Sequence, residues 1–357
     1  MTISLQDIID GIRPLNRGVV EKARARTARL VMPPRALGRL HEISEKLCGI
    51  QGTLKPSVQQ KAVLVMAGDH GIVEEGISAF PQDVTGAMIG TFLAGGAGIN
   101  AIARQVGAEV WVADMGIIPE IDAAGLKNRD RLLVRKVGRG TRNFARGPAM
   151  TLEDARKAVL TGFELASSLI RKGVDLLGTG DMGIGNTTPS AAIGAVITGR
   201  SIPDMVGPGT GVDDAGLSRK REAIRRGVDV NRPDPRDGLD VLSKVGGFEI
   251  GGIAGIVLAG AYHRKPVVID GFISTAGALI AHSLCPSVVD YLFAGHSSEE
   301  PGHRHMLGHL KLAPILSLGM RLGEGTGGAL AMGVIEAAVR VMTEVMTFEE
   351  AGVPDKA

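Results

Sequence analysis

The residues best suited to chemistry lie together in one stretch, Gly178–Pro189, which contains four glycines, Asp181, Asn186 and threonine hydroxyls. The apolar run Val174–Leu177 precedes it and predicts a buried parallel strand, and Ser190–Ile197 follows it with the pattern of a helix. The N–H groups of a glycine-rich turn and the positive end of a helix dipole together favour an anion such as phosphate. A tight turn without any ligand is the alternative, because a glycine-rich motif alone is weak evidence.

Two further loops carry groups that could complete such a site. The loop Gly207–Gly211 offers backbone donors, and Arg219 and Lys220 lie on the helix predicted to follow it. The loop Arg321–Gly328 holds Glu324 between glycines. A carboxylate beside an anion site can act as a general base. The alternative for Glu324 is an acidic residue that stabilises the N-terminus of a helix.

Other kinds of site fit the sequence less well. Gly178–Gly185 lacks the lysine of a P-loop, and no ribose-binding acid follows its G-x-G-x-x-G spacing, which leaves a dinucleotide site as a weak alternative. The chain contains no G-x-S-x-G motif for a nucleophilic serine. His303, His305 and His309 have a spacing that can ligate zinc, although a polar helix face explains the cluster more simply.

The composition sets limits on the class of protein. The 357 residues carry a net charge of +2 and 3% aromatic residues, so we expect no nucleic-acid partner. Cys48 and Cys285 lack metal-type spacing and suit a reducing compartment. The N-terminus predicts no signal peptide, and polar residues interrupt the uncharged stretch Gly271–Val289, which predicts a buried helix. We therefore expect a cytoplasmic protein without a membrane partner.

Short apolar runs alternate with helical patterns, which predicts an α/β fold with a mostly parallel sheet and flanking helices. The predicted strands lie at residues 61–66, 109–113, 174–177 and 266–270, with weaker candidates at 131–137 and 288–294. The predicted helices lie at 37–47, 84–106, 151–172, 190–197, 213–229, 250–262, 301–312 and 325–346. The glycine-rich loops follow strands, so we expect them to meet at the carboxyl edge of the sheet. The ends of the chain, 1–55 and 326–357, are expected to form a small helical domain beside a large catalytic domain of residues 56–325.

Several longer motifs occur in a fixed order along the chain: Pro33–Leu40, Ala67–Gly71, Gly178–Thr188, Asn231–Phe248, Asp270–Phe272 and Arg321–Gly325. In this order they resemble the nicotinate-nucleotide–dimethylbenzimidazole phosphoribosyltransferase family over nearly the whole chain. The resemblance implies a Rossmann-like α/β fold for the large domain, the two-domain division given above, a homodimer, and no metal or organic cofactor. It also implies transfer of phosphoribose from nicotinate mononucleotide to a benzimidazole base, with release of nicotinate.

The resemblance assigns roles to residues at matching positions, with Glu324 as the general base. The residues implied to bind the phosphate and ribose of the nucleotide are Asp181, Gly183, Gly185, Asn186, Thr187, Gly209, Gly211, Lys220 and Ser298. The residues implied to form the base pocket are Phe80, Met88, Met182 and Leu322. Asp181 departs from the family pattern, which usually has Glu, and Phe80 and Met88 replace Ser and Gln of the enteric-type pattern. The shortened acid keeps an alternative open, a non-catalytic protein of the same fold that binds nucleotides or aromatic bases.

Overall fold

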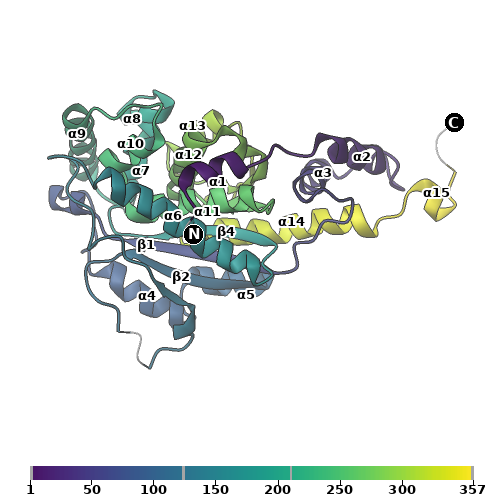
Figure 1. Ribbon diagram of the computed structural model, residues 1–357, viewed down its shortest axis with the longest axis horizontal. Coiled ribbons are helices and arrows are strands. Elements are labelled where there is room, and N and C mark those ends of the chain that lie inside the picture. The colour runs from purple at the N-terminus through teal and green to yellow at the C-terminus, as the bar shows by residue number, and fades with distance from the viewer. Residues whose placement is uncertain (1–2, 123–124, 210, 355–357) are drawn as a thin grey trace.

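The computed structural model describes residues 3–122, 125–209 and 211–354, and seven strands in these residues form one parallel sheet. The order across the sheet is β3-β2-β1-β4-β5-β6-β7, with every neighbouring pair parallel (Figure 1). The strands are β1 Lys61–Gly68, β2 Ala108–Gly116, β3 Leu132–Val134, β4 Leu176–Met182, β5 Val267–Ile269, β6 Leu292–His296 and β7 Pro314–Leu316. The predicted α/β class with a mostly parallel sheet is confirmed.

The strand order reverses between β1 and β4. The chain runs outward from β1 through β2 to β3, and then crosses back to form β4 on the other side of β1. Open α/β sheets bind ligands outside the carboxyl ends of their strands at such a switch point. Residues 69–71, after β1, and residues 183–186, after β4, lie at this place in the sheet.

Helices cover both faces of the sheet. They are α1 Leu5–Gly11, α2 Arg17–Thr27, α3 Arg39–Gln51, α4 Val84–Ala94, α5 Gly98–Val106, α6 Leu152–Arg171, α7 Thr187–Thr198, α8 Ile202–Met205, α9 Asp214–Asn231, α10 Gly238–Val245, α11 Phe248–Tyr262, α12 Phe272–Leu284, α13 His303–Leu310, α14 Thr326–Glu344 and α15 Phe348–Ala351. Helices α4, α5 and the first part of α14 lie on one face, and α11 and α12 lie on the other (Figure 1).

Helix α11 is the centre of the second face. Its residues Phe248–Ala261 are all buried, which suits a helix that is apolar almost all round. It packs so closely against α6 that a Cβ on Gly255 would lie 2.1 Å from the carbonyl oxygen of Val159. A capping box of Thr151 and Asp154 starts α6, at the residue where the sequence predicts the helix to begin. Because α6 packs on α11, it forms a second layer over this face of the sheet.

Several boundaries differ from those predicted. Strand β4 continues to Met182, whereas the sequence predicts that the strand ends at Leu177, because glycines without side chains can still pair in a buried parallel strand. The candidate strand at 288–294 begins only at Leu292. Helix α3 runs on to Gln51 and is ended by the left-handed Gly52, not near Gly49.

By length and composition alone, residues 84–106 are the only segment in the described ranges that could cross a membrane. The sequence predicts one helix here, but the structure divides it into α4 and α5. Gly95 ends α4 with a φ of +82°, and α5 starts only at Gly98. The uncharged stretch from Gly271 contains the buried helix α12, as predicted.

Helices α2 and α3 lie beside the C-terminal part of α14 at one end of the molecule, away from α4, with α15 beyond them (Figure 1). Helices α2 and α3 pack against each other and against α14. A small separate core lies between them, formed by Ala23, Cys48 and Met342. Leu30 and Thr347 form an antiparallel bridge that ties the N-terminal segment to the C-terminal one. Helix α1, by contrast, packs against α11.

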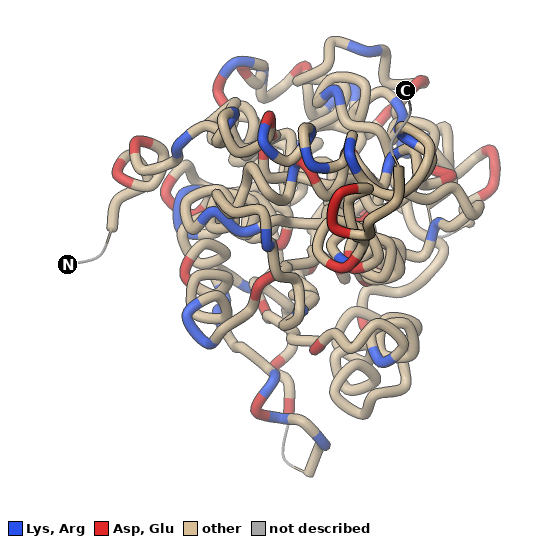
Figure 2. The backbone as a smooth tube through the Cα atoms, turned by 90° about the vertical axis from the view of Figure 1, so that its right-hand side faces the viewer, with Lys and Arg blue, Asp and Glu red and all other residues tan. Residues whose placement is uncertain are grey.

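Charged residues of both signs are interspersed along the backbone (Figure 2). On α9, for example, Arg225 pairs with Glu222 at 2.7 Å and with Asp229 at 2.8 Å. The net charge of +2 is therefore not concentrated on one side of this view.

Candidate active site

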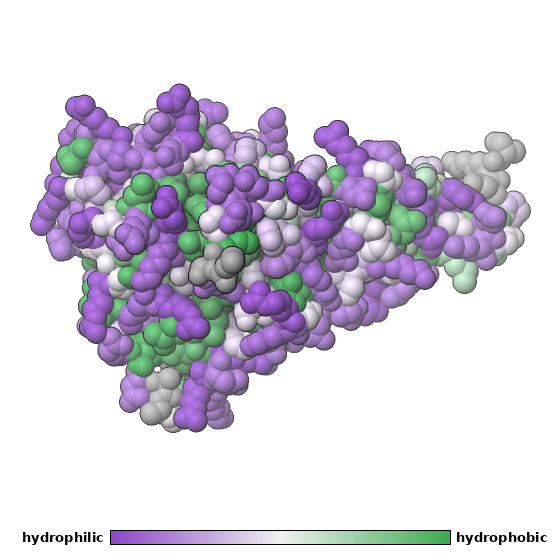
Figure 3. All heavy atoms as spheres, in the orientation of Figure 1, coloured by the Kyte–Doolittle hydropathy of each residue, from purple (hydrophilic) through white to green (hydrophobic). Residues whose placement is uncertain are grey.

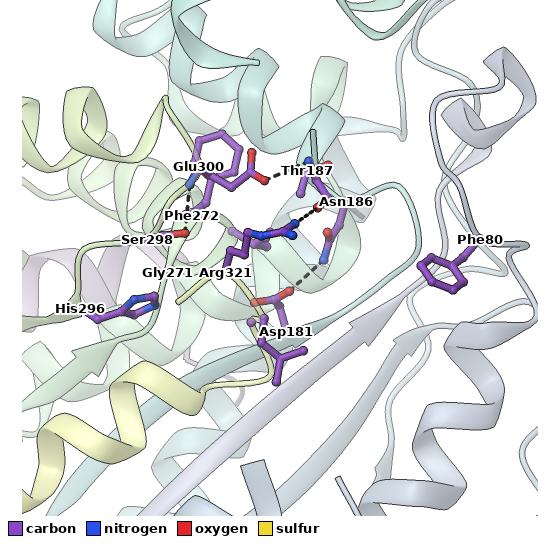
Figure 4. A pocket seen from close by; sticks show the side chains of 14 residues that line it. Phe80, Asp181, Asn186, Thr187, Gly271, Phe272, His296, Ser298, Glu300 and Arg321 are labelled. Atoms are coloured by element: carbon purple, nitrogen blue, oxygen red, sulfur yellow. Dashed lines mark hydrogen bonds between the residues drawn. The ribbon is translucent and has the colours of Figure 1, made fainter. Parts of the chain in front are cut away.

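A cavity of about 480 Å³ opens at the carboxyl edge of the sheet, and loops after β4, β5 and β6 form its walls (Figure 4). This volume suits a small-molecule ligand. The structure brings together seven residues that the sequence predicts to bind substrate, namely Phe80, Asp181, Asn186, Thr187, Gly209, Ser298 and Leu322. Segments more than 200 residues apart in the chain, from Phe80 to Leu322, thus meet at one site.

Other lining residues were not among the predicted site residues: Gly271, Phe272, Ile273, His296, Glu300, Arg321 and Gly323. Gly271 and Phe272 belong to the motif that follows β5, and Arg321 and Gly323 belong to the loop that holds Glu324, so the motifs carried a signal for them. Glu300 lies outside these motifs, and an acid before a proline is common at the exposed start of a helix. The sequence therefore did not mark Glu300 as a site residue.

Apart from Lys220 and Glu324, which are described below, five predicted residues do not line the cavity, namely Met88, Met182, Gly183, Gly185 and Gly211. Met88 and Met182 are half-buried against the core. A Cβ on Gly183 would lie 2.4 Å from the carbonyl oxygen of Gly68, so this glycine lets the loop after β4 pack on the end of β1. Gly211 is exposed and follows residue 210, which lies outside the described residues.

Asp181, near the end of β4, is held by the first turn of the helix that follows it. The side-chain amide of Asn186 donates a hydrogen bond of 2.9 Å to its carboxyl group (Figure 4). Burial, and after it the nearby carboxylate of Asp270, raises the pKa of Asp181 to about 8. The Asp181 carboxyl group is therefore mostly neutral at pH 7 and can donate a hydrogen bond to a ligand.

A corner of the cavity is built for an anion. The Lys220 ammonium donates hydrogen bonds to Thr187 Oγ1 at 2.7 Å and to the Gly207 carbonyl at 3.2 Å. Burial lowers the pKa of Lys220 to about 8, and Glu300 opposes this shift. Gly209, with a φ of +54°, lies so close that a Cβ there would be 3.0 Å from the Lys220 Nζ. Lys220 itself lies just behind the lining residues Thr187 and Gly209.

Ser298 is positioned by a buried imidazole. The Ser298 N–H donates to His303 Nδ1 at 2.9 Å, and His303 Nε2 lies 3.0 Å from the Thr275 hydroxyl. Burial lowers the pKa of His303 to about 3, so the ring is neutral. His309 lies instead on an exposed face, where its ring packs edge-on against His282. No group of three or more His, Cys, Asp or Glu residues in the described ranges has a metal-ligating arrangement.

Glu324 lies in the loop that leads into α14, in the left-handed conformation with a φ of +62° between Gly323 and Gly325. Its carboxylate accepts a hydrogen bond of 3.0 Å from the Ile99 N–H, in the first turn of α5. Asp270 fixes the start of α14, because its carboxylate accepts hydrogen bonds from the Gly325 N–H at 3.1 Å and the Gly328 N–H at 2.8 Å. Burial raises the pKa of Glu324, the Ile99 N–H opposes this, and Asp270 adds to it.

The backbone of Glu324 rests directly on β4. A Cβ on Gly180 would lie 2.4 Å from the Glu324 carbonyl oxygen and 2.8 Å from its carbonyl carbon. We expect Gly180→Ala to displace Glu324 and to lower turnover on the order of 10²-fold, since catalysis is sensitive to shifts of about 1 Å. Steady-state kinetics would measure the loss. Gly308→Ala, which has open space around its Cβ, is the matched control. Wild-type turnover in Gly180→Ala would contradict this view of the loop.

A cavity at the switch point of a parallel sheet, with a buried lysine and a left-handed glutamate beside it, is the arrangement of an α/β enzyme that acts on a small molecule. A family model described as phosphoribosyltransferase matches residues 12–353, and the chain belongs to this family. It is 53% identical to the nicotinate-nucleotide–dimethylbenzimidazole phosphoribosyltransferase of Geobacter sulfurreducens, over 98% of each chain. It is 51% identical to the enzyme of the same name from Roseiflexus, over 99% of this chain and 98% of that one.

Solved structures give the same result. A structure of nicotinate-nucleotide–dimethylbenzimidazole phosphoribosyltransferase from Thermus thermophilus superposes with a TM-score of 0.89, at 46% identity, over 96% of this chain and 100% of that one. A structure of CobT from the same organism has a TM-score of 0.90 at 48% identity, over 95% of this chain and 100% of that one. The chain therefore shares both sequence and fold with these phosphoribosyltransferases.

Proposed function

We propose that this protein transfers phosphoribose from nicotinate mononucleotide to 5,6-dimethylbenzimidazole or a related base, giving the α-riboside 5′-phosphate and nicotinate. The observation that carries the proposal is a cavity with a buried lysine just behind its lining residues Thr187 and Gly209, and a buried glutamate next to its lining residue Gly323. The names of its relatives support the same reaction.

The chemistry of the donor explains why few groups are needed. The glycosidic nitrogen of nicotinate mononucleotide is already a pyridinium cation, so nicotinate can leave without an acid. Attack by one benzimidazole nitrogen makes the ring cationic, and the Glu324 carboxylate accepts the proton from the other nitrogen. In-line attack inverts the configuration at C1′. The remaining catalysis consists of holding donor and acceptor in line.

The residues around the cavity divide into two groups in this proposal. The 5′-phosphate and ribose bind to Lys220, Gly209, Thr187 and Ser298, together with Asp181 and Asn186, which line the same cavity. Phe80 and Leu322 have exposed fractions of 51% and 61%, so both present apolar surface on which a flat aromatic base can stack. These groups act without a metal or organic cofactor.

The direct test mixes the protein with nicotinate mononucleotide and 5,6-dimethylbenzimidazole and follows nicotinate release. We expect nicotinate and the α-riboside phosphate to form in equal amounts, with the anomer identified by NMR. A panel of other benzimidazoles, purines and phenols defines the acceptor. Binding of both substrates without nicotinate release at high protein concentration would instead favour a non-catalytic binding protein.

The neutral Asp181 predicts a pH dependence. The pKa of Asp181 is raised to about 8, so its carboxyl group donates below that pH and ionises above it. We expect kcat to fall as pH rises through about 8, because the new charge would face Asp270 and Glu324. Measuring kcat at a saturating donor concentration separates this effect from the titration of Lys220, because a bound phosphate raises the pKa of Lys220. The side chain of Asp181→Asn stays neutral, so the fall in kcat at high pH should be absent in this variant. If the fall is unchanged in Asp181→Asn, another group causes it.

We also propose that the protein is a homodimer. Helix α4 has no charged residue but is only partly covered, and apolar side chains gather around it in the surface view (Figure 3). Uncovered apolar surface of this kind commonly marks an interface. Sedimentation equilibrium should give twice the mass of the chain. Met88→Lys, on this helix, should shift the equilibrium to monomer, whereas a monomeric wild-type protein would refute the proposal.

The domain division and the compartment belong to the same proposal. Residues 1–55 and 326–357 form the small helical domain in this proposal, supported by the packing of α2 and α3 on α14. Helix α1 and the first part of α14 pack instead on the large domain of residues 56–325, which carries the chemistry. A cytoplasmic location fits the free, buried cysteines Cys48 and Cys285.

A further inference from the structure

A carboxylate lies inside the corner that is built for an anion. Glu300 has an exposed fraction of 5% and lines the cavity beside Thr187 and Gly209 (Figure 4). Its Oε1 accepts a hydrogen bond of 3.0 Å from the Gly209 N–H. Its Oε2 is buried and has no hydrogen-bond partner among the described residues. This oxygen packs against Gly207, where a Cβ would lie 2.2 Å from it. A buried carboxylate oxygen without a hydrogen-bond partner is costly, and a proton on the carboxyl group relieves that cost.

The charges around Glu300 come from three directions. Lys220 faces it from α9, and Arg321, from the loop before α14, donates to the Gly209 carbonyl at 3.4 Å. On the side of α13, His303 is neutral and bonded to the Ser298 backbone. Helix α7 contributes the uncharged Thr187, and the loop at 207–209 contributes backbone groups. Burial raises the pKa of Glu300, whereas Lys220, the Gly209 N–H and Arg321 favour its ionised form. Glu300 thus places an acidic group inside a site with one buried and one exposed cation.

A phosphate monoester in this corner meets a like charge. With a second pKa of about 6, it is mostly a dianion at pH 7. A dianion beside an ionised carboxylate is strongly unfavourable where water is excluded. A single proton between the two groups converts this repulsion into a short, charge-assisted hydrogen bond. The total charge of ligand and Glu300 then matches the two cations.

We propose that Glu300 is a specificity-determining residue that shares one proton with the 5′-phosphate of the donor, so that the donor binds with uptake of a proton from solvent. This inference rests on the proposed function and names how its phosphate is recognised. No covalent bond changes; the proton simply bridges a phosphate oxygen and the Glu300 carboxylate. Sulfate has a much lower affinity for a proton than a phosphate monoester has, so it forms this bridge poorly and is consequently disfavoured.

Calorimetry with ribose 5-phosphate as the probe tests the proton directly. Titrations at pH 7 in buffers of different ionisation enthalpy give the number of protons bound, and we expect ~0.9 for the wild type, since about nine-tenths of the free phosphate is a dianion at this pH. Glu300→Gln should take up almost none. Glu299→Gln removes a charge at the adjacent, exposed position and should behave as the wild type. A wild-type value near zero overturns the inference without any variant.

A competition experiment tests the specificity. Inorganic phosphate and sulfate are compared as inhibitors against nicotinate mononucleotide. The wild type should prefer phosphate, and Glu300→Gln should shift the phosphate-to-sulfate ratio at least tenfold toward sulfate. An unchanged ratio overturns the inference. Nicotinate release by the wild type separates the two ideas: release without proton uptake refutes the role of Glu300 alone, whereas proton-linked binding of ribose 5-phosphate without release refutes the transferase reaction alone.

Discussion

Glu324→Gln should lower kcat by ~10²–10⁴-fold, the usual contribution of a general base, while the protein stays folded. Glutamine has the same shape and still offers an oxygen to the Ile99 N–H, so the loop keeps its hydrogen bond. It cannot accept the acceptor's proton. The Michaelis constant for nicotinate mononucleotide should change little, because Lys220 and Gly209 remain in place. Initial rates of nicotinate release measure kcat and the Michaelis constant, and thermal unfolding shows whether the variant stays folded.

The pH profile makes this prediction sharper. Glu324 must be ionised to accept a proton, and its pKa is raised by burial and by Asp270. The acid limb of kcat/KM should therefore lie above the pH at which an ordinary glutamate titrates, about 4.3. Glu324→Gln should lack this limb. Glu344→Gln, at the exposed far end of α14, is the control. A rate within threefold or so of wild type in Glu324→Gln would remove Glu324 from the mechanism.

Lys220→Met should weaken donor binding on the order of 10²-fold, since truncating one partner of a buried, hydrogen-bonded charge pair costs about 2–5 kcal/mol. A methionine side chain occupies a similar volume to lysine but carries no charge. The loss should appear in the Michaelis constant for nicotinate mononucleotide, because Lys220 lies at the anion corner and not beside Glu324. It should be largest for the 5′-phosphorylated donor, so nicotinate riboside should bind the variant and the wild type alike.

Arg221→Met is the matched control for this prediction. Arg221 follows Lys220 on α9 but is exposed, so its removal changes the net charge equally without touching the cavity. Equal losses in the two variants would mean that general attraction, and not a specific contact, accounts for donor affinity. A normal Michaelis constant in Lys220→Met would place the phosphate elsewhere.

The sequence predicted the sheet where apolar runs are long and ended by glycine, as for β1 and β2. The sequence did not predict those strand and helix boundaries that depend on close packing of the backbone. Gly178 and Gly180 belong to β4 because Met332 and Glu324 occupy the space that their side chains would need, and no local pattern reveals such partners. The break between α4 and α5 was missed because Gly95 is a helix end only when its φ is positive. Strand β7 is too short for a pattern.

The candidate site was predictable to a similar extent. Asp181, Thr187 and Glu324 lie in glycine-rich motifs, and the structure places all three at or beside one cavity. The motifs could not reveal Glu300. Its burial depends on Gly207, where a Cβ would lie 2.2 Å from Glu300 Oε2, and these residues are far apart in the chain. Buried charge is set by tertiary contacts, which periodicity does not encode.

The bridge between Leu30 and Thr347 has a consequence for biosynthesis. Domains usually fold in the order in which the ribosome delivers them. Here α2 and α3 emerge early but have no α14 to pack against until residues 326–344 have been made. The nascent chain can build its sheet before then, yet Glu324 gains its support only when α14 forms. A chain truncated just before α14 should thus be inactive, and proteases should trim its N-terminal helices.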